Sequence, residues 1–135
     1  MKPKFLSPLE VRLIGYQSFE LLTPLTFENA KFVITVYPGF DYDGASIPQA
    51  LWHIVGCPMG GLYSAAACIH DALYASRLFN RKTCDKLFHE AMIASGTDRS
   101  LAKRMYLAVR AFGESSYEEG EDLSKYRNLV KIDLK

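Results

Sequence analysis

Four side chains capable of acid–base chemistry lie close together in the most apolar part of the sequence. His70 and Asp71 are adjacent, Tyr74 follows His70 by one helical turn, and Asp85 comes in the next helical stretch. An unpaired ionisable group is costly to bury, so these residues need partners. On a helix, His70 and Tyr74 share one face, whereas Asp71 points about 100° away from His70. We therefore expect His70 and Asp71 to serve different partners.

Asp85 is the expected partner of His70. The stretch 80–92 should return antiparallel after a short connection and bring Asp85 opposite both His70 and Tyr74. A carboxylate bonded to one imidazole nitrogen and to the Tyr74 hydroxyl fixes the tautomer of His70 and leaves the other nitrogen to act as a base. The pattern predicts a water-activating His–Asp pair whose free ring edge is open to water. Asp71, pointing elsewhere, is a candidate ligand for a hard cation.

Several other polar residues have two interpretations each. Asp43 precedes a glycine in the loop-like stretch 41–48, so it serves either an Asp-Gly turn or a metal ion. His89 lies one turn after Asp85 and is a candidate for the same site, with a packing role favoured. Arg77 and Arg81 are expected to face solvent or pair with carboxylates, and a phosphate head group is the alternative partner.

Composition narrows the class of protein. The 135 residues suit one domain over 1–135, with 49% hydrophobic and 23% charged residues. A net charge of +1 gives no argument for nucleic-acid binding. No apolar run is long enough for a membrane span, and the start lacks the pattern of a signal peptide. The three cysteines form neither a disulfide framework nor a CxxC metal motif.

The elements that must position the site change type along the chain. A β region over 19–40 contains two runs, with a turn at Glu28-Asn29, and Pro24 places the first run at an edge or breaks it. Within the second run Phe32, Ile34 and Val36 share one face.

A helical region over 49–113 follows, and then a tail over 114–135 that contains one late strand in NLVKIDL. A short helix is expected over 49–56, and the main helices over Tyr63–Arg77, over Thr83–Ala94 and from about residue 98 to 112. The second of these helices should begin at Thr83 or Lys82 and end at Gly96. The third should begin at Thr97 or Asp98 and end at Gly113. Its core face is expected to consist of Leu101, Met105, Ala108, Val109 and Phe112. The fold class predicted is α+β: an N-terminal β-hairpin or small antiparallel sheet packed on three main helices, two of which form the hairpin that carries the site.

The motifs CIHDALY and TCDKLF, which span roughly residues 64–92, resemble the core of phospholipase A2. In that family the catalytic helix carries Cys-x-x-His-Asp-x-x-Tyr and the facing helix carries a second aspartate. By position, the resemblance implies that His70 activates water, that Asp71 binds calcium, and that Asp85 and Tyr74 orient His70. It also implies an ester substrate of the lipid class.

A second resemblance covers about residues 36–113. The stretches VYPGFDYDGASIP, IHDALY and RKTCDKLF look like a family of small phage and prophage proteins of unknown function. That resemblance implies a phage origin, a location in the host cytoplasm or the virion, and lipid, cell-envelope material or virion proteins as partners. The sequence leaves the oligomeric state open.

Three functions follow as hypotheses. The leading one is an ester hydrolase, which requires Asp85 to contact His70 beside a cleft. The first alternative is a non-enzymatic phage tail, assembly or host-interaction protein, in which the same polar groups only fix the helix pairing. The second alternative is a metal phosphohydrolase of the His-Asp type, which requires His53, His70 and Asp71 to converge on one metal.

Overall fold

The computed structural model describes residues 2–15, 18–42, 63–114, 117 and 123–135. The predictions for Asp43, for His53 and for a short helix over 49–56 lie outside the described residues. Within the described ranges, none of the helices combines the length and the apolar composition of a membrane-spanning segment.

One four-stranded antiparallel sheet has the order β1-β4-β5-β7. Its strands are β1 (Lys4–Phe5), β4 (Leu25–Glu28), β5 (Phe32–Val36) and β7 (Val130–Leu134). The hairpin β4–β5 turns at residues 29–31, and the late strand predicted in the tail pairs with β5, placing Val130 opposite Val36. Ile34 and Val36 are fully buried, which confirms the predicted core face of this run. Strand alternation alone was sufficient to locate that face.

A second antiparallel sheet has the order β2-β3-β6. It consists of β2 (Val11–Gly15), β3 (Ser18–Leu21) and β6 (Asp41–Tyr42). The first predicted run is thus broken before Pro24, and its two halves join different sheets. Strand β2 was not predicted, because four of its five residues are exposed and no alternation of buried and exposed residues marks it. Residues 41–42 were expected in a loop, yet they pair with Phe19 and Glu20.

Three main helices follow: α2 (Ser64–Ser76), α3 (Arg81–Ala94) and α4 (Arg99–Phe112). The predicted start of α3 at Lys82 or Thr83 was wrong, because the Asn80 side chain accepts the Thr83 N–H and begins the helix earlier. Asp98 caps α4 as predicted, and Gly96 takes a positive φ of 86° after α3. A short helix, α6 (Leu123–Arg127), precedes β7.

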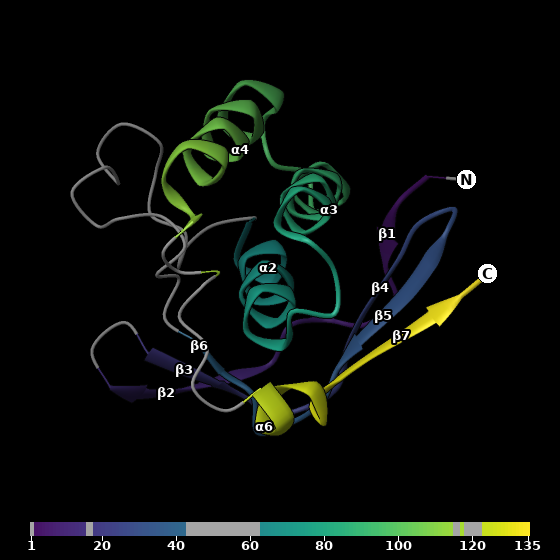
Figure 1. Ribbon diagram of the computed structural model, residues 1–135, viewed down its shortest axis with the longest axis vertical. Helices are drawn as coiled ribbons and strands as arrows, with labels where there is room; N and C mark the ends of the chain where they lie inside the picture. The colour runs from purple at the N-terminus through teal and green to yellow at the C-terminus, as the bar shows by residue number, and fades with distance from the viewer. Residues whose placement is uncertain (1, 16–17, 43–62, 115–116, 118–122) are drawn as a thin grey trace.

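The helices stack on the sheets with α2 in the middle (Figure 1). Helix α2 contacts β4, β6, β7 and α6 on one side and α3 on the other, and α3 contacts α4. The α+β fold with three main helices is therefore confirmed. The position of α2 explains why so much of it is buried, since it has neighbours on both sides.

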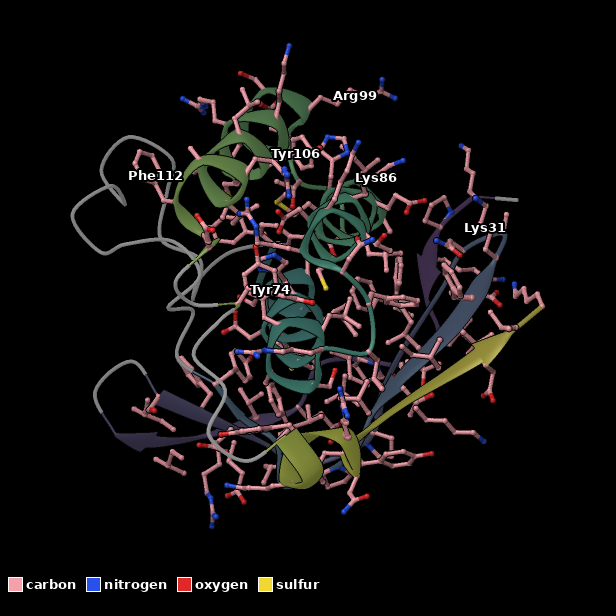
Figure 2. All side chains as sticks on the ribbon, in the orientation of Figure 1. Lys31, Tyr74, Lys86, Arg99, Tyr106 and Phe112 are labelled. Atoms are coloured by element: carbon pink, nitrogen blue, oxygen red, sulfur yellow. The ribbon has the colours of Figure 1, made fainter. Side chains whose placement is uncertain are left out.

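One predicted core residue was wrongly placed. Phe112 is 52% exposed, whereas Met105 and Val109 on the same helix are fully buried. Figure 2 shows Phe112 on the side of α4 that faces away from α3. Residue 112 belongs to the last turn of α4, where helical spacing still repeats although none of the described helices lies opposite.

Candidate functional site

Three helices meet at one carboxylate. Asp85 lies on the face of α3 turned towards α2, with none of its surface exposed, and His70 and Tyr74 lie on the facing side of α2. Arg110 approaches from α4. The α2–α3 hairpin therefore brings His70, Tyr74 and Asp85 together, as their spacing predicted. We call these four residues the Asp85 cluster.

One oxygen of Asp85 serves both residues of α2. His70 Nε2 lies 2.7 Å from Asp85 Oδ1, and the Tyr74 hydroxyl donates to the same oxygen over 2.5 Å. An ionised carboxylate only accepts hydrogen bonds, so Nε2 carries a proton, and in the neutral form of the ring Nδ1 is the unprotonated nitrogen. Phe88 stacks on the imidazole with ring centroids 4.4 Å apart, and Tyr74 lies against it at 4.2 Å. These contacts fix both the tautomer and the orientation of the ring.

The second oxygen of Asp85 binds arginine. Arg110 Nη1 donates to Oδ2 over 2.8 Å, and Arg81 Nη1 lies 3.9 Å away. Arg81 also donates to the backbone carbonyls of Val109 and Arg110 in the last turn of α4. Arg81 therefore ties α3 to the carboxyl end of α4, where the helix dipole favours a cation.

Electrostatics favour the charged form of Asp85. Burial alone raises the pKa of this carboxyl, but hydrogen bonds from His70, Tyr74 and Arg110 outweigh burial and hold it below its ordinary value. The pKa of the Tyr74 hydroxyl is raised, first by burial and then by the neighbouring carboxylate. Tyr74 therefore stays a hydrogen-bond donor at neutral pH, and Asp85 stays its acceptor.

The prediction of an open ring edge on His70 was wrong. The side chain is only 1% exposed, so bulk water does not reach the imidazole in this conformation. The sequence could place Tyr74 against the ring, one helical turn away, but it could not place Phe88, which stacks on the imidazole only once α3 has packed against α2.

Asp71 lies in a different environment, as the angle between neighbouring helical residues predicted. The pKa values of the Tyr42 hydroxyl on β6 and of the Cys68 thiol are both raised, mainly by burial. The negative charge of the Asp71 carboxylate raises both pKa values further. No three His, Cys, Asp or Glu side chains gather into a metal site within the described part of the chain. Of the two ligands predicted for calcium, which binds six to eight oxygens, Asp71 is described and Asp43 lies outside the described residues.

Other candidates turned out differently. His89 does not contact the Asp85 cluster but meets the edge of Tyr106 on α4, with ring centroids 5.6 Å apart. Arg77 lies over the Tyr117 ring at 5.5 Å, and its Nε and Nη2 atoms are buried without a hydrogen-bond partner.

Arg110 was not predicted from the sequence as part of the site. One signal was available: an aspartate within the apolar face of α3 needs a cation, and α4 has an arginine directly after its buried Val109. Gly113, the residue that ends α4, was predicted as a helix boundary but also packs on the site. A Cβ there would lie 2.6 Å from the Tyr74 hydroxyl.

Comparison with known proteins gives a family but no activity. A family model described as a protein of unknown function (DUF1353) matches residues 19–109. The uncharacterized protein y4jT of Sinorhizobium fredii is 35% identical over 96 residues, which cover 70% of this chain and 29% of that protein. The uncharacterized protein y4iH of the same organism is 41% identical over 92 residues, covering 67% of this chain and 38% of that protein. The chain thus spans about a third of the length of these relatives. No solved structure matches it significantly.

Proposed function

The chain belongs to the DUF1353 family, and we propose from its Asp85 cluster that it is a hydrolase that cleaves an ester with water as the nucleophile. One observation carries the proposal: His70 Nε2 and the Tyr74 hydroxyl converge on a single oxygen of Asp85, at 2.7 and 2.5 Å. This arrangement holds His70 in the tautomer a general base requires. It also stabilises the imidazolium that forms when the ring accepts a proton.

The proposed reaction uses the Nδ1 nitrogen of His70. Nδ1 takes a proton from water while the water oxygen attacks the carbonyl carbon of the ester, and the carbonyl π electrons move to its oxygen. The tetrahedral intermediate then breaks its bond to the leaving oxygen, and the imidazolium returns the proton to that oxygen. The products are a carboxylic acid and an alcohol. Asp85 stays ionised throughout, since its pKa is held low.

The mechanism also requires that an ester and a water molecule gain access to His70. The ring is 1% exposed, so the surrounding chain must open before an ester and a water molecule can reach Nδ1. A cation held by Asp71 would stabilise the negative charge that develops on the carbonyl oxygen. Calcium on Asp71, with Asp43 as a second ligand, stays a prediction that a chelator tests.

The substrate class we propose is a lipid or another ester of the cell envelope, which suits a phage-encoded or prophage-encoded protein acting in the host cytoplasm or from the virion. The similarity of CIHDALY and TCDKLF to the phospholipase A2 core supports this choice.

A second candidate function is favoured by the burial of the cluster. Asp85 is fully buried and holds three donors from α2 and α4. Such a network can serve only to fix how helices pack, in a non-enzymatic phage tail, assembly or host-interaction protein. The third hypothesis, a metal phosphohydrolase, depends on His53, which lies outside the described residues.

An assay on the purified protein separates the first two candidates. Ester hydrolysis should be measured on a panel of phospholipids and soluble esters, with calcium and with chelator. His70→Ala should lower the rate by about 10²–10⁴-fold, the usual contribution of a general base. The matched control is His89→Ala, a histidine outside the cluster, which should retain the wild-type rate on soluble esters that carry no phosphate.

A second variant guards against misfolding. Tyr74→Phe keeps the ring and removes the donor to Asp85, so it should lower the rate while urea unfolding stays cooperative. Hydrolysis that is indifferent to His70→Ala contradicts the catalytic assignment. A well-folded wild type with no activity on any ester, together with strong destabilisation by His70→Ala, supports the non-enzymatic candidate instead.

A further inference from the structure

A groove lies between α3 and α4, on the side of α3 away from α2. Its volume is about 580 Å³, within the roughly 300–1,000 Å³ of small-molecule sites. Figure 2 shows Lys86 of α3 and Tyr106 of α4 beside the gap between these two helices. We call this hollow the α3–α4 groove, and its wall includes Lys86, His89, Ile93, Arg99, Lys103 and Tyr106. It shares no wall residue with the Asp85 cluster.

The groove carries excess positive charge. Lys86, Arg99 and Lys103 are exposed, and none of them forms an ion pair with a described residue. The one carboxylate in the wall belongs to Glu90, which accepts a hydrogen bond from the buried Asn29 over 3.3 Å. Three cations against one carboxylate favour an anionic ligand.

The wall between these charges is aromatic and apolar. His89 and Tyr106 meet edge to face across the groove, with an interplanar angle of 70°, and Ile93 is half-buried beside them. Ring faces and an aliphatic side chain bind flat or apolar groups, which a free inorganic anion lacks.

We propose that the α3–α4 groove binds an organic phosphate, that is, a phosphate monoester on an aromatic or apolar body. A phosphate dianion matches several cations better than a single carboxylate does, and the guanidinium of Arg99 offers a planar fork that suits phosphate oxygens. The aromatic pair and Ile93 would contact the organic body. The proposal is independent of the hydrolase, because the groove and the Asp85 cluster use different residues.

Binding of 1-naphthyl phosphate to the full chain tests the proposal. Titration followed by amide NMR at low salt should give a dissociation constant below about 1 mM, with shifts concentrated on residues of α3 and α4. Inorganic phosphate and 1-naphthol, which each carry one half of the recognised chemistry, should bind at least about tenfold more weakly. Binding should weaken as salt is added, because the cations are exposed.

Two matched pairs of variants localise the site. Lys86→Gln and Lys103→Gln should each weaken binding about 2- to 5-fold, in line with exposed charge pairs. The controls are Lys82→Gln on α3 and Arg104→Gln on α4, which remove exposed cations outside the groove wall and should leave the affinity unchanged. Equal effects within the pairs would overturn the proposal, as would equal affinity for 1-naphthyl phosphate and inorganic phosphate.

The same chemistry can be presented by a free ester or by a lipid. Vesicles that contain phosphatidic acid form the second arm, with pure phosphatidylcholine vesicles as control. Binding to phosphatidic acid that depends on Lys86 and Lys103, but not on Lys82 and Arg104, identifies a lipid-borne phosphate as the source. Binding of 1-naphthyl phosphate alone, with the same dependence, identifies a free ester. Failure of both arms overturns the inference and leaves the hydrolase proposal untouched.

Discussion

Two neighbouring residues of α3 place opposite charges in opposite environments. Asp85 is fully buried and its two oxygens accept hydrogen bonds from His70, Tyr74 and Arg110. Lys86 is exposed at the wall of the α3–α4 groove and has no ion pair with a described residue. A buried charge must be satisfied within the protein, whereas an exposed charge is satisfied by water and stays available to a ligand. The charge of Asp85 on the face of α3 turned towards α2 is therefore satisfied within the protein, whereas the charge of Lys86 on the opposite face stays accessible to a ligand.

The largest expected effect on stability comes from removing the buried carboxylate of Asp85. Asp85→Ala leaves His70, Tyr74 and Arg110 without their acceptor, so the free energy of unfolding should fall by about 3–5 kcal/mol. Urea denaturation followed by circular dichroism measures it. Asp133→Ala is the control, since Asp133 is half exposed and pairs with Lys131 at 3.6 Å on the surface, and it should cost less than about 1 kcal/mol. Similar losses in the two variants would erase the contrast between buried and exposed charge.

A smaller effect is expected where the chain packs on the cluster. In Gly113→Ala the new Cβ meets the Tyr74 hydroxyl and the Val109 carbonyl at 2.6 Å, so Tyr74 must shift away from Asp85. We expect a loss of about 1–3 kcal/mol in thermal or urea unfolding. Gly15→Ala, whose nearest described neighbour would lie at an ordinary 3.7 Å, is the matched control and should be nearly neutral. An unchanged Gly113→Ala would mean that Tyr74 is not held tightly.

Acidification should gradually reduce the stabilisation that the ionised Asp85 carboxylate provides. The pKa of Asp85 lies below its ordinary value of 3.8 in the folded chain, so the unfolded chain binds this proton more tightly. The stabilisation is therefore complete above pH 3.8 and is lost as the pH falls through the lower, folded pKa. Urea midpoints measured at a series of acidic pH values follow this loss. Asp85→Asn should flatten that part of the profile, and an unaltered profile would assign the acid sensitivity to other carboxylates.

The smallest effect on stability is expected when exposed lysines of α3 are replaced. Lys86→Gln and Lys82→Gln should both change the free energy of unfolding by less than about 0.5 kcal/mol, because each side chain is exposed and without an ion pair to a described residue. Only their binding of 1-naphthyl phosphate should differ. A marked destabilisation by Lys86→Gln alone would show that this lysine supports the fold rather than a ligand.

The sequence predicted those features of the fold that depend on a few neighbouring residues. Alternation located the buried face of β5, and Asp98, Gly96 and Gly113 marked helix ends because capping depends on a few neighbouring residues. Strand β2 was not predicted because it lacks buried residues that alternate with its exposed ones. Phe112 was misplaced because a helical repeat does not tell where the opposing helix ends.

The candidate site divides in the same way. The sequence by itself determined that His70 and Tyr74 share a face of α2, that Asp71 points elsewhere, and that Asp85 sits one connection away, because helical geometry is set by residue spacing. Only the tertiary structure decided that Arg110 donates to the second oxygen of Asp85, that Phe88 stacks on the imidazole, and that α3 and α4 leave a basic groove. These features depend on how separate helices pack, and packing is set by side chains distant in sequence that no local pattern relates.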